Sequence, residues 1–243
     1  MIQQSFIFLE GVNKKTEQNI WQQGVTTWES FLIAQKIMGI SKKRKLYYDK
    51  KILEAKKELY LLNASYFIDK LPSVEMWRLY SFFKEDAVFL DIEVDAYDII
   101  LIGLYDGIDT KIMVKGVNLE KKVLLDELKK YKLIITFNGK SFDLPKIKKY
   151  SDISELKIPV IDLKHVCSRL GLTGGLKKVE KRLGITRPSH LYGNPVDLWK
   201  AYHASGDREY LELLVQYNEE DIINLKPVME WCYKECLAVF RGG

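Results

Sequence analysis

The stretch that decides the fold is residues 88–107, which read VFLDIEVDAYDIILIGLYDG. Its apolar residues indicate a strand in the middle of a sheet, yet Asp91 and Glu93 interrupt the run. Side chains two apart on a strand point to the same face, roughly 6.5–7 Å apart along the chain. Because burying a charge is costly unless something neutralises it, we expect either a bound cation or a raised pKa at these two acids.

The pattern around this stretch predicts an α/β domain. We expect strands over 87–94, 98–106, 110–117, 132–137 and 158–162, and helices over 118–131 and from about 141 to 150. From Leu163 onward the sequence reads as mostly helical. Three strands in a meander, followed by alternating helix and strand, are typical of a mixed five-stranded sheet flanked by helices.

The first 80 residues have a different, helical character. Residues 1–40 read as short helices, and 43–70 as a longer helix that Pro72 ends. We therefore expect a helical N-terminal region over 1–80 and the α/β domain over 81–243. Residues 8–32 resemble a degenerate helix-hairpin-helix, an element that grips the duplex backbone through a Gly-rich hairpin, although Asn13 stands where the second glycine belongs. The alternative is that these helices only pad the sheet.

Composition excludes several classes of protein. With 47% hydrophobic and 29% charged residues, the 243-residue chain is globular rather than disordered or fibrous. We expect neither a signal peptide nor a membrane span, since no apolar run approaches the roughly 20 residues that cross a bilayer. Cys167, Cys232 and Cys236 are odd in number and lack a framework spacing, which favours a cytoplasmic location. A zinc site at Cys232 and Cys236 would need two further ligands, and none has a convincing spacing.

The charge distribution points to an anionic partner. The net charge is +5, and basic residues gather in 41–51, 146–150 and 175–185. Any one cluster can be explained as a solvated helix face. Three clusters flanking the acid-bearing segments favour a phosphate-backbone partner, meaning nucleic acid.

Two more acidic elements follow Asp91 and Glu93. Asp143 lies in TFNGKSFDLP (136–145), at the start of a predicted helix, where acids are often simple caps. Tyr217 and Asp221 lie in LLVQYNEEDIINL (213–225), four residues apart and so on one helix face. Each element alone has an ordinary structural explanation.

In combination, the motifs D-x-E, F-N-x3-F-D-x-P and Y-x3-D resemble those of the DEDD 3′–5′ exonucleases of the ribonuclease H-like superfamily, in the tyrosine-bearing subclass. The similarity is closest to the YprB-like ribonuclease H-like domain proteins and extends over about residues 71–230. It implies a ribonuclease H-like sheet and a metal-dependent 3′–5′ exonuclease that hydrolyses phosphodiester bonds. The histidine subclass would carry its histidine at Gln216.

The resemblance also implies roles for individual residues. Asp91, Glu93, Asp143 and Asp221 take the places of the metal-binding carboxylates, and Tyr217 that of the residue orienting the attacking water. Hard oxygen ligands suit Mg²⁺ or Mn²⁺, and two such ions about 3.5–4 Å apart would hold the scissile phosphate. The predicted contacts to nucleic acid are Asn138, Phe142, Lys146, Lys177, Lys178 and Arg182.

The sequence departs from many relatives after the first acids, with Val94-Asp95-Ala96 where Thr and Gly are common. Two other functions stay open: a non-catalytic nucleic-acid-binding module, and a structure-specific endonuclease on the same fold. These motifs do not indicate whether the substrate is DNA or RNA, or whether it is single-stranded or structured. They also do not indicate the oligomeric state.

Overall fold

The computed structural model describes residues 1–96, 98–191 and 194–242. Its strands are β1 (Ala87–Asp95), β2 (Asp98–Tyr105), β3 (Thr110–Val114), β4 (Leu133–Thr136) and β5 (Val160–Asp162). Its α-helices are α1 (Lys14–Trp21), α2 (Trp28–Ile33), α3 (Lys42–Tyr60), α4 (Tyr80–Phe83), α5 (Lys121–Leu128), α6 (Asp143–Tyr150), α7 (Leu163–Arg169), α8 (Leu176–Leu183), α9 (Pro195–Ser205) and α10 (Arg208–Gly242). Short 3₁₀ helices are η1 (Ile2–Gln4), η2 (Ala64–Phe67), η3 (Ser73–Leu79) and η4 (Lys84–Asp86).

The five strands form one mixed sheet in the order β3-β2-β1-β4-β5. β1, β2 and β3 pair antiparallel, as short connections allow, whereas β4 and β5 pair parallel and follow helical crossovers. The prediction of an α/β domain with a five-stranded mixed sheet flanked by helices is confirmed.

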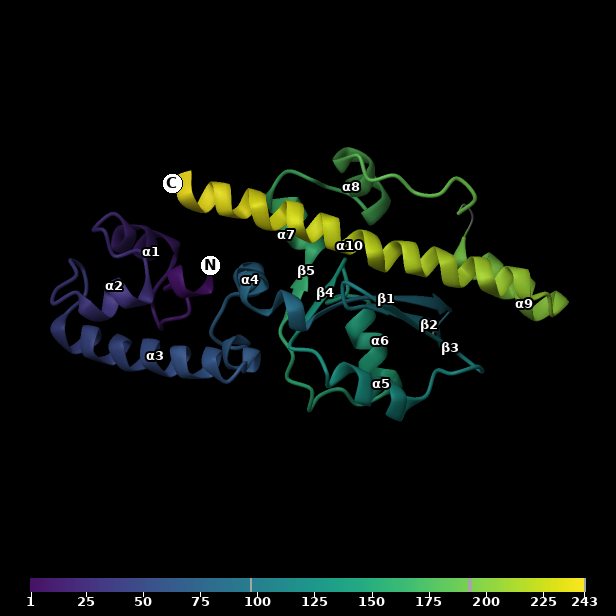
Figure 1. Ribbon diagram of the computed structural model, residues 1–243, viewed down its shortest axis with the longest axis horizontal. Coiled ribbons are helices and arrows are strands. Elements are labelled where there is room, and N and C mark those ends of the chain that lie inside the picture. Colours follow the sequence, from purple (N-terminus) through teal and green to yellow (C-terminus); the bar gives the residue numbers. More distant parts are fainter. Residues whose placement is uncertain (97, 192–193, 243) are drawn as a thin grey trace.

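The central strand β1 has two differently covered faces. Val88, Leu90 and Ile92 pack in one apolar cluster with residues of α5 and α6. Phe89, on the opposite face, belongs to a second cluster together with Leu225 of α10. Figure 1 shows α5 and α6 on one side of the sheet and α10 crossing the other. Because side chains alternate along a strand, the odd-numbered Asp91 and Glu93 project toward α10.

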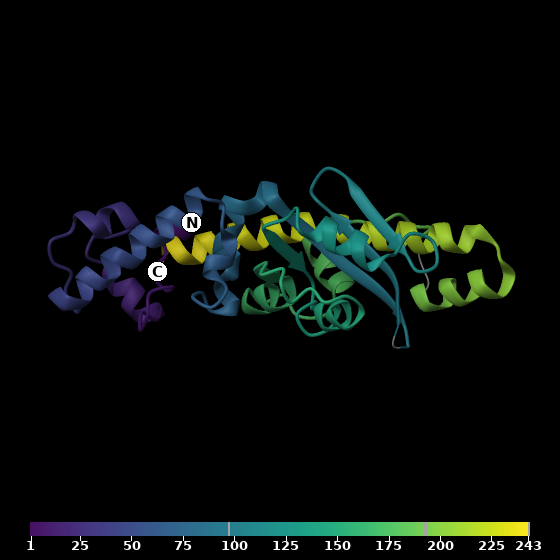
Figure 2. The same ribbon diagram turned by 90° about the horizontal axis from the view of Figure 1, so that it is seen from below.

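Helix α10 is the longest element, with 35 residues or roughly 52 Å. It runs along the length of the molecule, from α9 at one end to the N-terminal helices at the other (Figures 1 and 2). Near its C-terminal end the Phe240 ring lies edge-on to Trp21, with centroids 4.2 Å apart. Despite its length, neither α10 nor any other helix within the described ranges is apolar enough to cross a membrane.

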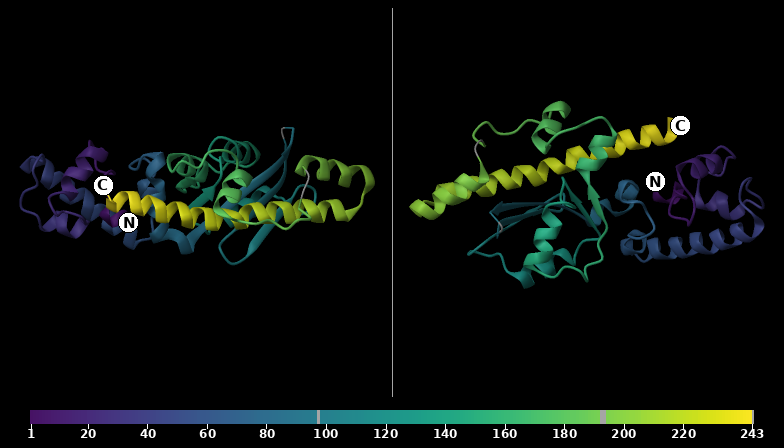
Figure 3. Two further views of the ribbon diagram at one scale, coloured as in Figure 1. Left: turned by 90° about the horizontal axis from the view of Figure 1, so that it is seen from above. Right: turned by 180° about the vertical axis from the view of Figure 1, so that it is seen from behind.

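The N-terminal helices share their core with the sheet domain. One apolar cluster extends from Ile2 and Trp28 through Phe89 to Met229 and Cys236. The views from above and behind place the C-terminus beside these helices (Figure 3). The N-terminal region is therefore packed into the same core rather than tethered to it.

A buried ionic network adds to this junction. Arg78 of η3 is 3% exposed, and its Nη1 donates to both carboxylate oxygens of Glu17 of α1, at 2.9 Å each. Its Nε donates to Glu75 at 2.9 Å. Lys14 and Arg169 also pair with Glu75, each at 2.8 Å, so the network joins α1 to α7.

The expected helix over 43–70 is wrong at its C-terminal end, because α3 stops at Tyr60. Leu62 adopts a left-handed φ of 53°, and the Asn63 side chain donates to Glu58 at 2.6 Å, which closes the helix. Pro72 was the expected breaker, but the chain turns ten residues earlier, at a Leu-Leu-Asn sequence that carries no strong stop signal.

The three cysteines are buried free thiols. Cys167 of α7 and Cys232 of α10 lie with their sulfur atoms 3.4 Å apart. They join the two helices as packing groups in the shared core.

Candidate active site

Strand β1 and helix α10 bring three acids together. One carboxylate oxygen from each of Asp91, Glu93 and Asp221 lies within 4.8 Å of the others. The pairing of β1 with β2 shifts register directly after Glu93. Such bulges re-aim side chains and are common beside functional sites. Acids separated by more than a hundred residues thus meet at one point.

Asp143, the first residue of α6, lies against the same strand. It is 2% exposed, and its Oδ1 accepts the Ile92 N–H at 3.1 Å. Because β4 pairs with β1 only as far as Phe89, this N–H would otherwise lack an acceptor on that side. Asp143 therefore adjoins the three clustered acids but is not one of the group within 4.8 Å.

The electrostatics of the site disfavour four free carboxylates. Burial, reinforced by the neighbouring acids, raises the pKa of Asp91 well above its usual range and that of Glu93 to about 8. Burial raises the pKa of Asp143 to about 7 and also raises that of Asp221. The donor set consists of clustered hard oxygens with unfavourable mutual repulsion, and this fits a divalent cation such as Mg²⁺ or Mn²⁺.

Tyr217 lies one turn before Asp221 on the same face of α10. The tyrosine is 6% exposed, and its hydroxyl oxygen accepts a hydrogen bond from Nζ of Lys177 on α8. The Lys177 ammonium also lies 4.3 Å from the centre of the Tyr217 ring. Burial raises the pKa of Tyr217, so its phenol stays protonated at neutral pH. Lys177, predicted as a nucleic-acid contact, thus lies at the site itself.

Asn218 is a site residue that the sequence analysis missed. It is fully buried, and its Nδ2 donates to Oδ2 of Asp91 at 2.9 Å. Gly103 pairs with Asp91 across β1 and β2, and a Cβ at Gly103 would approach Cγ of Asn218 to 2.9 Å. A glycine inside the apolar run of β2 was the available signal, because glycine in a strand often marks such a close approach.

Arg187 and Glu180 were also missed. Arg187 donates through Nε and Nη2 to the two oxygens of Glu180, at 2.7 and 2.6 Å. Its Nη2 also donates to Oδ1 of Asp221. The arginine lies after the end of α8, so nothing in the local sequence indicates that it reaches α10.

The predicted contacts near β4 and α6 lie beside Asp143. Asn138 adopts a left-handed φ of 69°, and its N–H donates at 2.8 Å to Asp162, the last residue of β5, which the sequence analysis missed. The Phe142 ring is 40% exposed, and the Lys146 ammonium lies 4.9 Å from its centre. The chain therefore presents an exposed aromatic ring and a cation next to an acid of the site.

Lys178 and Arg182 share α8 with Lys177, and all three side chains are exposed. Arg182 donates to the carbonyl of Gly171 at 3.5 Å, and Lys178 packs beside Gly174. Within the described part of the chain, neither Lys178 nor Arg182 contacts any of the four acids. Both lie on the outer face of the helix that carries Lys177.

The turn at Gly11, expected to act as a hairpin, is covered by α3. Gly11 has a φ of 75°, and the Glu10 carbonyl accepts bonds from Tyr48 at 2.7 Å and Arg44 at 3.4 Å. Asn13 is extended rather than left-handed and caps α1 by accepting the Thr16 N–H. The helix-hairpin-helix role of this region stays a prediction.

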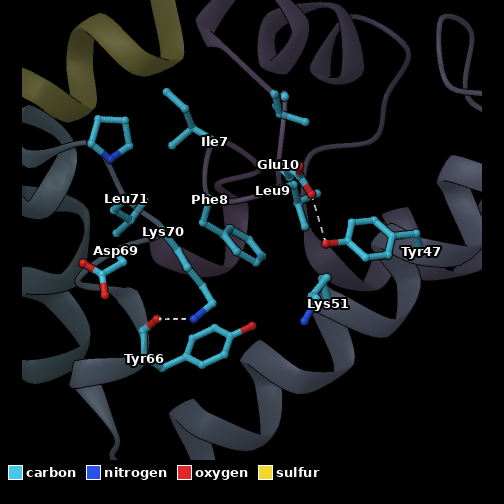
Figure 4. A pocket seen from close by; sticks show the side chains of 13 residues that line it. Ile7, Phe8, Leu9, Glu10, Tyr47, Lys51, Tyr66, Asp69, Lys70 and Leu71 are labelled. Atoms are coloured by element: carbon cyan, nitrogen blue, oxygen red, sulfur yellow. Dashed lines mark hydrogen bonds between the residues drawn. The ribbon is translucent and has the colours of Figure 1, made fainter.

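A cavity of about 530 Å³ lies between the Gly11 turn, α3 and the segment around Lys70 (Figure 4). Its lining includes two lysines and two acids, Lys51, Lys70, Glu10 and Asp69. The Lys70 ammonium is held by the Tyr66 carbonyl at 2.9 Å. The charges balance, so the cavity has no excess of one sign to select a ligand.

Comparison with known proteins agrees with this geometry. A family model described as the RNase H superfamily matches residues 88–233, which is more than half of the chain. The matched range contains the four acids and Tyr217. Searches of curated proteins and of solved structures give no match. By fold and by family match, the chain belongs to the RNase H superfamily.

Proposed function

We propose that this protein is a metal-dependent 3′–5′ exonuclease of the DEDD type, in the tyrosine-bearing subclass and nearest to its YprB-like members. The observation that carries the proposal is the convergence of Asp91, Glu93 and Asp221 within 4.8 Å in a domain of the RNase H superfamily. An acidic cluster of this kind, beside Asp143, fits a phosphodiester hydrolase that works with divalent ions.

The metal set that we propose is Mg²⁺ or Mn²⁺, two ions held by Asp91, Glu93, Asp143 and Asp221. When bound, such ions supply the positive charge that polarises a phosphate and lowers the pKa of water. The chain itself contributes position: β1 fixes Asp91 and Glu93, and α10 fixes Asp221. The Tyr217 hydroxyl oxygen accepts from Lys177, which leaves its own proton free to donate to a water or a phosphate oxygen.

We propose nucleic acid with a 3′ end as the substrate. The exposed Phe142 ring next to Lys146 is suited to stacking on a base or sugar, and Asn138 lies in the adjoining turn. Lys177, Lys178 and Arg182 of α8 offer charge to the phosphate backbone. We further propose that residues 1–80, a helical region, extend this surface, and that the protein acts in the cytoplasm.

A nuclease assay tests this proposal. Purified full-length protein is given Mn²⁺ or Mg²⁺ and 5′-labelled DNA and RNA that is single-stranded, 3′-recessed or structured. We expect a ladder shortened from the 3′ end, abolished by EDTA, and reduced more than about 100-fold by Asp91→Ala. Glu212→Ala, an exposed acid on the same helix as Asp221, is the control and should retain the parent rate.

Other outcomes identify the alternatives. One internal cut in a structured substrate would indicate an endonuclease. Binding of nucleic acid without cleavage by either metal would indicate a non-catalytic module, and cleavage by Asp91→Ala at the parent rate would contradict the proposed site.

A further inference from the structure

We propose that Glu180 and Arg187 form a positioning pair that sets the orientation of the Asp221 carboxylate. This inference rests on the proposed function, in which Asp221 binds a divalent ion. Neither residue belongs to the acid and tyrosine motifs, and both come from α8 and the segment that follows it, which Figure 1 places beside α10.

Burial and a two-point hydrogen bond fix the geometry of the Glu180–Arg187 pair. Glu180 is 2% exposed and uses both carboxylate oxygens on Arg187, whose side chain is 14% exposed. A two-point bond of this kind fixes the plane of the guanidinium as well as its place. Because Glu180 lies within α8, the arginine is held by a helix and not only by its own flexible stem.

The fixed guanidinium in turn constrains Asp221. Its Nη2 binds Oδ1 of the aspartate, and one oxygen of the same carboxylate belongs to the cluster with Asp91 and Glu93. A carboxylate anchored through one oxygen cannot rotate freely about its Cβ–Cγ bond. Partners that anchor a ligand in this way commonly affect metal affinity nearly as much as the ligands do.

The same segment also contacts the tyrosine of the site. The guanidinium carbon of Arg187 lies 5.9 Å from the centre of the Tyr217 ring, and Lys177 of α8 binds the Tyr217 hydroxyl. Both functional side chains of α10 are therefore oriented by α8 and the residues just after it.

Stability alone does not account for this arrangement. A buried ion pair often adds little to the free energy of unfolding when compared with an apolar pair of similar volume. Moreover, Nη1 of Arg187 is buried without a hydrogen-bond partner among the described residues, and a buried unpaired donor is unfavourable. A role in holding Asp221 explains why the chain tolerates this buried, unpaired donor.

Calorimetric titration of the full-length protein with Mn²⁺ tests the pair. The double variant Glu180→Gln/Arg187→Met removes one charge of each sign, so the net charge at the site is unchanged and only the anchoring is lost. We expect its Kd for Mn²⁺ to rise about 10–100-fold. The control Asp126→Asn/Lys129→Met removes an exposed pair of the same net charge at the C-terminal end of α5 and should leave the Kd unchanged.

If the double variant fails to fold by circular dichroism, Arg187→Lys replaces it. That variant keeps the positive charge but cannot form the planar two-point bond to Glu180, so we expect a Kd at least about 10-fold higher. A folded variant that binds Mn²⁺ with the parent Kd would overturn the proposal that Glu180 and Arg187 position Asp221. The proposed function fails separately, if the parent binds no Mn²⁺ or if Asp221→Asn binds it as tightly as the parent.

Discussion

Glu93 and Asp143 contribute to the pH dependence of the stability of the metal-free protein. Burial raises their pKa values from 4.5 to about 8 and from 3.8 to about 7, so between these limits the folded chain binds more protons than the unfolded chain. Their contribution to the free energy of unfolding is therefore present at low pH and is lost as pH rises toward 8. We predict that urea unfolding in EDTA shows falling stability across this range.

Two comparisons identify which groups cause the predicted fall in stability with pH. Glu93→Gln carries no titrating group and should flatten the decline, while added Mn²⁺ should raise stability most at the alkaline end, where the acids are ionised. A parent protein whose stability in EDTA is flat or rises from pH 4.5 to 8 would contradict the electrostatic description of the site.

Gly103 is the second residue whose substitution has a defined effect. A methyl group there would collide with the fully buried Asn218, which donates to Asp91 and has no space to move aside. We predict that Gly103→Ala lowers the free energy of unfolding by about 1–3 kcal/mol in chemical denaturation. Gly175→Ala, where a Cβ meets open space, is the matched control; an equal loss in both variants would exclude the steric explanation.

The acids and the tyrosine were singled out because their motifs in combination resemble a known family, and the structure brings Asp91, Glu93 and Asp221 together. Arg187 and Asn218 were not singled out, because their roles depend on partners 34 and 127 residues away, Asp221 and Asp91. Residues 184–191, which include Arg187, form neither helix nor strand, so no local periodicity in the sequence indicates where they lie.

At the scale of elements, strands were predicted more closely than helix ends. β1, β2 and β4 lie within one residue of the expected ranges, because apolar runs bounded by turn residues have short and definite limits. The helix expected over 43–70 was too long, because its end depends on a left-handed Leu62 that no propensity favours.

Helix α3 presents a stripe in which Lys43, Lys50 and Lys57 recur every seven residues on one exposed face. Exposed apolar side chains alternate with them, Leu46 at 58%, Leu53 at 55% and Tyr60 at 86%. If this stripe follows a phosphate backbone, reversing the three charges should weaken nucleic-acid binding and lower the slope of log K against log salt by about 2–3.

Fluorescence anisotropy over a range of salt concentrations measures that slope. The triple reversal at Lys121, Lys122 and Lys129, exposed lysines of α5 and its C-cap, changes the net charge equally and should affect the slope much less. Equal effects of the two triple variants would show that net charge matters and the α3 stripe does not.

At the scale of the whole molecule, Arg78 joins the N-terminal helices to the sheet domain. Arg78→Met would leave Glu17 buried without its counter-charge and take one partner from Glu75. We predict a loss of about 3–5 kcal/mol in the free energy of unfolding, in a single transition because the apolar core is continuous. Lys129→Met, which breaks an exposed pair, should cost under about 1 kcal/mol. Two separate transitions in the parent would contradict a shared core.

The span of α10 has a practical consequence for anyone dissecting the protein. The helix that carries Tyr217 and Asp221 also packs its far end on Trp21, so a recombinant fragment beginning at residue 81 would expose the apolar face that α10 turns to the N-terminal helices. We expect such a fragment to aggregate, and limited proteolysis near residue 80 not to release a well-behaved sheet domain. Here the segment that a family match outlines is smaller than the unit that must be expressed.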